Sequence, residues 1–100
     1  MAQVAQNPQL RARIEHALAY LRREWQSIPE LAAEWDDEWD EHSRFVFALD
    51  WPICEDSLHQ LREWAKQDLL TPEQHAQYDE LLDLVARNRP TLGRLLKSTE

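Results

Sequence analysis

The chain has one hundred residues, of which 43% are hydrophobic and 30% charged, and this balance excludes an intrinsically disordered protein. Its net charge of −8 disfavours direct binding to nucleic acid, because neutralisation of phosphates supplies most of that affinity. A single glycine disfavours an all-β fold, and the lone Cys54 excludes an internal disulfide and a cysteine-based zinc site. We therefore expect one helical domain over residues 1–100, with residues 1–7 disordered.

The first predicted helix begins at Pro8, with Asn7 as its N-cap. A proline fits the first helical turn because its missing N–H would have no partner there. Apolar residues then recur at steps of three and four and form one stripe, which is typical of a helix packed on a core. The stripe consists of Leu10, Ile14, Ala17, Leu18, Leu21 and Trp25.

A second helix is predicted from Ile28, because Ser27 and Glu30 have the spacing of a capping box around Pro29. Its expected apolar stripe is Ile28, Leu31, Ala32, Trp35 and Trp39.

The polar residues 40–43 favour a break and can cap a new helix that carries Phe45, Val46 and Leu49. One continuous helix is the alternative, because helical spacing also persists across these residues. Trp51-Pro52 is predicted to end the segment, since the residue before a proline is disfavoured in the α region.

The remaining chain predicts three more helical segments. One is entered through Pro52 and buries Leu58, Leu61, Trp64, Ala65 and Cys54. Thr71 and Gln74 form a second capping box, before a stripe of Tyr78, Leu81, Leu82 and Val85 that ends at Asn88. Pro90 is expected to start a last short helix with Leu92, Leu95 and Leu96. The predicted fold is all-α, a compact bundle of five or six short helices.

The densest chemical feature is a run of carboxylates in the middle of the chain. Residues 27–60 carry a charge of −9, and the triplet Glu-Trp-Asp occurs at 34–36 and again at 38–40. A step of four places like residues on one face of a helix, so two tryptophans surrounded by acid form a candidate binding surface. The residues proposed for protein interaction are Glu34, Trp35, Asp37, Glu38, Trp39 and Glu41.

This pattern favours a non-catalytic protein-interaction module, such as a small bacterial regulator, antitoxin or immunity-type protein. The expected partner is a protein with a basic surface, attracted electrostatically, or a second copy of the chain. One alternative is an acidic mimic of nucleic acid that inhibits a nucleic-acid enzyme, which needs carboxylates spread over an extended surface. A second is a self-assembling structural domain.

Catalysis and cofactor binding have weaker signals. The carboxylates lack the spaced ligands and central glycine of an EF-hand, so no metal or other cofactor is expected. A metal-dependent enzyme using His42, His59 and nearby carboxylates is the low-probability alternative. Cys54 has no base at helical spacing and is interpreted as a small buried or half-buried thiol. No signal peptide and no membrane-spanning segment are recognised, so a cytoplasmic location is expected and no membrane partner.

Overall fold

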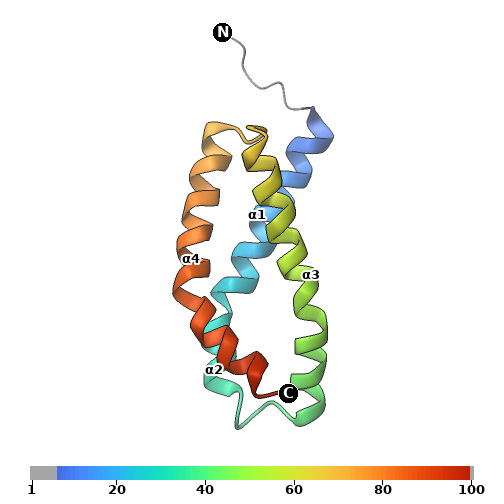
Figure 1. Cartoon of the computed structure of the whole chain (residues 1–100), viewed down its shortest axis with the longest axis vertical. Coiled ribbons are helices and arrows are strands. Elements are labelled where there is room, and N and C mark those ends of the chain that lie inside the picture. Colours follow the sequence, from blue (N-terminus) through green and yellow to red (C-terminus); the bar gives the residue numbers. More distant parts are fainter. Residues whose placement is uncertain (1–6, 100) are drawn as a thin grey trace.

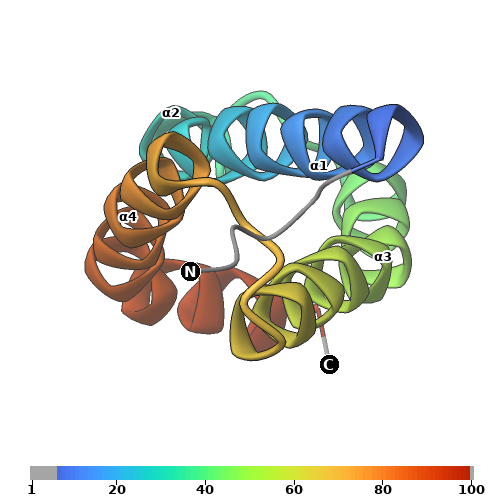
Figure 2. The same ribbon diagram turned by 90° about the horizontal axis from the view of Figure 1, so that it is seen from above.

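The computed structural model describes residues 7–99 and contains four helices: α1 (Pro8–Gln26), α2 (Ile28–Glu34), α3 (Glu41–Lys66) and α4 (Pro72–Lys97). The long helix α1 packs against both α3 and α4, and the short α2 packs against α4 at one end (Figures 1 and 2). Helices α1 and α4 run in the same direction, and α3 runs in the opposite one (Figure 1). The described residues contain no strand, so the all-α prediction is confirmed.

The predicted number of helices is wrong: there are three long helices and one of seven residues, not five or six short ones. The error arises at two prolines, because α3 continues through Pro52 and α4 continues through Pro90. Asn88, expected to end a helix, lies inside α4, is buried, and donates its side-chain amide to the Leu84 carbonyl at 2.9 Å.

Both prolines stand on the solvent side of their helices. The carbonyl four residues before each proline loses its intrahelical donor, and on this side water replaces that donor. On the opposite side the apolar stripe continues without interruption, for example from Val85 to Leu92 and Leu95 in α4. Core packing therefore outweighs the local penalty of a proline in a helix interior, which is about 3 kcal/mol.

This account predicts that Pro90→Ala raises the free energy of unfolding by about 2 kcal/mol, because alanine restores the missing hydrogen bond while the unfolded chain gains some freedom. Urea unfolding followed by circular dichroism measures the change. The matched control is Pro72→Ala, at the first position of α4, where no bond is gained and little change is expected. A lower stability for Pro90→Ala would mean that the proline shapes the packing of Leu92 and Leu95.

The helix starts follow the predicted caps in three of four cases. The Asn7 side chain accepts from the Leu10 N–H at 2.7 Å, and Asp40 caps α3 by accepting from the Ser43 N–H at 2.7 Å. The capping box of Thr71 and Gln74 is present, with both bonds at 3.1 Å. These caps satisfy N–H groups that have no partner within the helix.

The capping box predicted at Ser27 is absent, because α1 passes almost directly into α2. Ser27 has helical dihedral angles, its N–H bonds to the Arg23 carbonyl at 3.2 Å, and its hydroxyl donates to the Glu24 carbonyl at 2.8 Å. The side chain is therefore turned toward α1 and makes no cap for α2. The chain bends here because Pro29 has no N–H to donate to the preceding turn.

One core joins the helices, and α1 contributes its centre: Ile14, Leu21, Trp25 and the adjoining Ile28 are fully buried. Burial of each such side chain contributes roughly 1.5–3 kcal/mol. No helix among residues 7–99 is long and apolar enough to span a membrane. The disorder predicted for residues 1–6 lies outside the described residues, whereas Asn7 is held as a cap.

Candidate functional site

The acidic segment forms the connection between α2 and α3, at the lower end of the molecule in Figure 1. The sequence predicted Trp35 and Trp39 on one face of the second helix, but α2 ends at Glu34 and residues 35–40 form a turn. A break between two helices was predicted at 40–43; the structure has it earlier, at residues 35–40, and α3 begins at Glu41. The carboxylates that follow α2 are repelled by the partial negative charge at the C-terminal end of that helix. Asp40 and Glu41 interact favourably with the partial positive charge at the start of α3.

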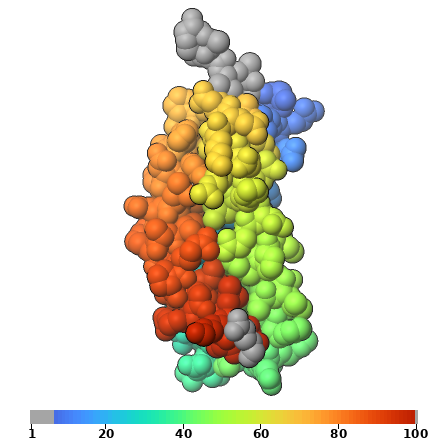
Figure 3. Space-filling model, in the orientation of Figure 1, coloured from blue at the N-terminus to red at the C-terminus, as the bar shows by residue number. Residues whose placement is uncertain are grey.

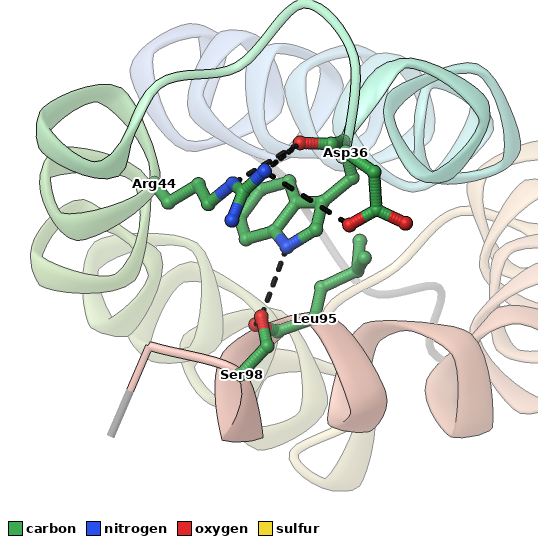
Figure 4. A network of polar contacts seen from close by, with 5 residues as sticks. Asp36, Arg44, Leu95 and Ser98 are labelled. Atoms are coloured by element: carbon green, nitrogen blue, oxygen red, sulfur yellow. Dashed lines mark hydrogen bonds and ion pairs between the residues drawn. The ribbon is translucent and has the colours of Figure 1, made fainter.

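Trp35 is the structural anchor of this turn, with 3% of its surface exposed. Its indole N–H donates to the Ser98 hydroxyl at 2.9 Å, which ties the turn to the end of α4 (Figure 4). Its carbonyl accepts two bonds from Arg44 of α3, at 2.6 and 3.1 Å, and the guanidinium lies over the indole ring at 5.6 Å. The buried ring therefore serves the fold and is not available as an exposed contact.

Trp39 is half-buried and stacks on Trp35 with ring centroids 5.5 Å apart. Phe47 of α3 contacts both rings edge-on, at 5.6 and 6.0 Å, and Trp51 continues the series toward Trp25. Such aromatic pairs contribute about 0.5–1.5 kcal/mol each beyond the area they bury. The predicted pair is thus brought together, although by a turn and not by a helix face.

The four predicted carboxylates, Glu34, Asp37, Glu38 and Glu41, are all exposed. They take part in no ion pair within the described part of the chain, whereas the neighbouring Asp36 lies 3.9 Å from Arg44. Hydrogen bonds from Ser43 to the cap hold the pKa of Asp40 below its usual value. The turn therefore presents a small patch of negative charge to solvent.

A second surface, which the sequence analysis did not identify, lies on the outer side of α3. Phe45, Val46, Leu49 and Ile53 are exposed, with fractions of 52%, 40%, 60% and 62%. The opposite side of the same helix faces the core with Phe47, Trp51, Cys54, Leu58 and Leu61. We call Phe45, Val46, Leu49 and Ile53 the outer stripe. In the space-filling view, the side of α3 that is turned toward the viewer, shown in green to yellow, is not covered by another helix (Figure 3).

The outer stripe was missed because Trp51-Pro52 was expected to divide the helix. Phe45 and Leu49 were assigned to one short segment and Ile53 fell in the next, so their common face was not recognised. Read as a single helix from 41 to 66, the sequence has apolar residues on two opposite faces, at 47, 51, 54, 58 and 61 and at 45, 49 and 53. These two apolar faces are the sequence signal that predicts the outer stripe.

A groove separates the upper parts of α3 and α4, and an ion pair crosses its edge. Arg89 donates both guanidinium nitrogens to the Glu55 carboxylate at 3.0 and 3.2 Å, and Trp51 donates its indole N–H to the same carboxylate at 2.8 Å. Burial alone would raise the pKa of Glu55, but these bonds outweigh it and hold the pKa below its usual range. Glu55 and Arg89, two of the groups that line the groove, thus join α3 to α4.

His42 and His59 lie on α3 seventeen residues apart, roughly 25 Å along the helix axis. In the described part of the chain no three His, Cys, Asp or Glu side chains are grouped so as to hold a metal ion. Cys54 is buried, as predicted, and burial followed by the nearby Glu24 and Glu55 raises the pKa of its thiol to about 12.

Comparisons with family models, with curated proteins and with solved structures found no match to this chain.

Proposed function

We propose that this protein is a non-catalytic protein-interaction module that binds its partner through the outer stripe of α3 and the adjoining acidic turn. The single observation that carries the proposal is the exposure of Phe45, Leu49 and Ile53 on one side of a helix whose other side is in the core. A helix that is apolar on opposite faces is typical of a helix buried on both sides.

The size of the stripe supports this function. Its four side chains expose on the order of 400 Å² of apolar surface, which is the size of the largest apolar patch on a typical monomer, and such a patch often has a function. The exposed parts of these side chains add no stability to the isolated fold, since burial is what makes an apolar side chain stabilising. Contact with another molecule accounts for them.

The acidic turn adds charge to the same surface. Glu41 lies one helical turn before Phe45, so the acidic turn leads into α3 where the outer stripe begins. Unpaired surface charge increases the rate of association with an oppositely charged partner more than it increases affinity. A regulator, antitoxin or immunity-type protein, which captures one partner quickly, fits this combination. The carboxylates gather in one short turn, which favours this reading over an extended mimic of nucleic acid.

The proposal is tested by affinity capture from native cells with three forms of the protein: wild type, Leu49→Gln/Ile53→Gln, and Leu82→Gln. Leu82 is also exposed, at 41%, but it lies on α4 and serves as the matched control. We expect a partner that wild type and the control retain and the stripe variant loses, and whose purified form binds wild type directly. Equal capture by all three forms would remove the outer stripe as the binding surface.

Charge reversal tests the turn separately. The combined variant Glu34→Lys/Asp37→Lys/Glu38→Lys/Glu41→Lys is expected to associate with that purified partner at least tenfold more slowly in stopped-flow measurements at low salt. The reason is that the turn then repels the basic partner that it attracts in the wild type. The folded state is retained, since all four side chains are exposed. An unchanged association rate would exclude a steering role for these carboxylates.

A further inference from the structure

We infer that the outer stripe binds a basic amphipathic helix of a partner protein. This inference rests on the proposed function and adds the chemistry of the partner.

The spacing fits a helical ligand. Phe45, Leu49 and Ile53 follow one another at steps of four and form a straight ridge, roughly 12 Å long, on α3. A ridge of this kind packs into the groove of a second helix, and three turns of that helix cover it. Docking of an apolar helix face with anchors three and four residues apart is a common mode of peptide recognition.

The border of the stripe is acidic. Glu41, Asp50 and Asp56 are exposed on α3 around the apolar side chains. Arg44 is the one Lys or Arg between positions 41 and 58, and it is committed to the carbonyl of Trp35. A partner helix with lysine or arginine beside its apolar face therefore finds carboxylates on α3 and no unengaged lysine or arginine between positions 41 and 58.

The same charges disfavour a second copy of this chain as the occupant. Two α3 helices paired antiparallel about Leu49 would place six carboxylates, Glu41, Asp50 and Asp56 from each copy, around one small apolar contact. Like charges placed in an interface oppose association. The area argues in the same direction, because about 400 Å² is half of the roughly 800 Å² that each partner buries in a standard interface. It suits one docked helix.

The test uses three synthetic helical peptides of about eighteen residues as probes. The first has a leucine and isoleucine seam with lysine and arginine flanks, the second has the same seam with glutamate flanks, and the third has the basic flanks with a serine and alanine seam. Each is titrated into the ¹⁵N-labelled full chain while backbone amide shifts are followed. We expect the first peptide to bind at least tenfold more tightly than the other two and to shift amides between 45 and 53.

Variants of the chain separate the contributions of seam and charge. Leu49→Gln/Ile53→Gln is expected to weaken binding of the first peptide at least tenfold, while Leu82→Gln leaves it within twofold of wild type. Asp50→Asn/Asp56→Asn is expected to weaken it severalfold at low salt and to match wild type at 0.5 M salt, where exposed charges are screened. All these positions are exposed, and thermal unfolding confirms that each variant is folded.

Several results would overturn the inference. If the third peptide bound as tightly as the first, charge attraction alone would explain the binding. If the second peptide bound as tightly as the first, a basic partner would be excluded. Self-association in sedimentation that Leu49→Gln/Ile53→Gln abolishes would identify a second copy as the occupant, and stripe-dependent binding to phosphatidylcholine vesicles would identify a lipid surface. A cellular partner that needs the stripe but presents no basic helix would overturn this inference and leave the proposed function intact.

Discussion

Replacing Trp35 by alanine is expected to lower the free energy of unfolding by about 3–5 kcal/mol, the cost typical of truncating a large buried aromatic side chain. The substitution removes the ring that contacts Trp39 and Phe47, and it leaves the hydroxyl of Ser98 without its indole donor. It also removes the ring beneath the Arg44 guanidinium. Because small domains are stable by about 5–15 kcal/mol, this is a large part of the total.

The measurement is urea unfolding followed by far-ultraviolet circular dichroism, which does not depend on tryptophan emission. Trp39→Ala is the matched control: its ring is half-buried and donates no hydrogen bond that the structure records among residues 7–99, so a cost of about 1–2 kcal/mol is expected. Trp35→Phe keeps a ring but loses the bond to Ser98, and an intermediate cost is expected. Equal costs at 35 and 39 would contradict the assignment of Trp35 as the anchor.

The result bears on the function because the sequence predicts Trp35 and Trp39 as parts of one binding surface. Their repeated triplet predicted them on one helix face; the structure instead brings them into contact in a turn, with ring centroids 5.5 Å apart. It could not predict which ring is covered. Ser98 lies sixty-three residues away, and nothing in the local sequence indicates that the end of α4 returns to this turn.

The helix starts could be predicted because their determinants are local. A cap such as Asp40 or Thr71 accepts from an N–H three residues ahead, so a short sequence window contains both partners. The helix lengths could not be predicted in this way. The cost of a proline inside a helix at Pro52 is visible in the local sequence, whereas the burial of α3 against other helices, which outweighs that cost, is not. Asp68 is a further case: it ends α3 with a φ of 61°, in a position where glycine is the usual signal.

Division of α3 at Pro52 also concealed the candidate site. With the helix divided, Phe45 and Leu49 belong to one predicted helix and Ile53 to the next. In the intact helix, Phe47 and Trp51 occupy the core side, which places Phe45 and Leu49 on the opposite side by geometry alone. The wrong end predicted at Pro52 therefore concealed the face that Phe45, Leu49 and Ile53 share.

Cys54 is expected to react with a thiol reagent at pH 8 about 1000-fold more slowly in the folded protein than in urea. The thiolate is the reactive form, and burial followed by the carboxylates of Glu24 and Glu55 raises the pKa of this thiol from 9.0 to about 12. At pH 8 the thiolate fraction then falls from about one tenth to about one ten-thousandth. Absorbance of the released chromophore measures both rates, and a difference below tenfold would show that the thiol is not held in its neutral form.

The raised pKa of Cys54 also determines how the stability of the fold changes at alkaline pH. Because the pKa of Cys54 is higher in the folded protein than in the unfolded chain, the neutral thiol's contribution is fully present below pH 9 and is lost as the pH rises toward 12. Burial, with Cys54 and Glu24, raises the pKa of Tyr20 as well, so both groups destabilise the fold in this range. Cys54→Ala is therefore expected to be less stable than wild type at pH 7 but to lose less stability between pH 8 and 10.5. If the stability of both proteins depended on pH in the same way, the thiol would ionise as easily in the core as in water. The packing of α3 on α1 around Cys54 would then be looser than the contacts on the core side of α3 indicate.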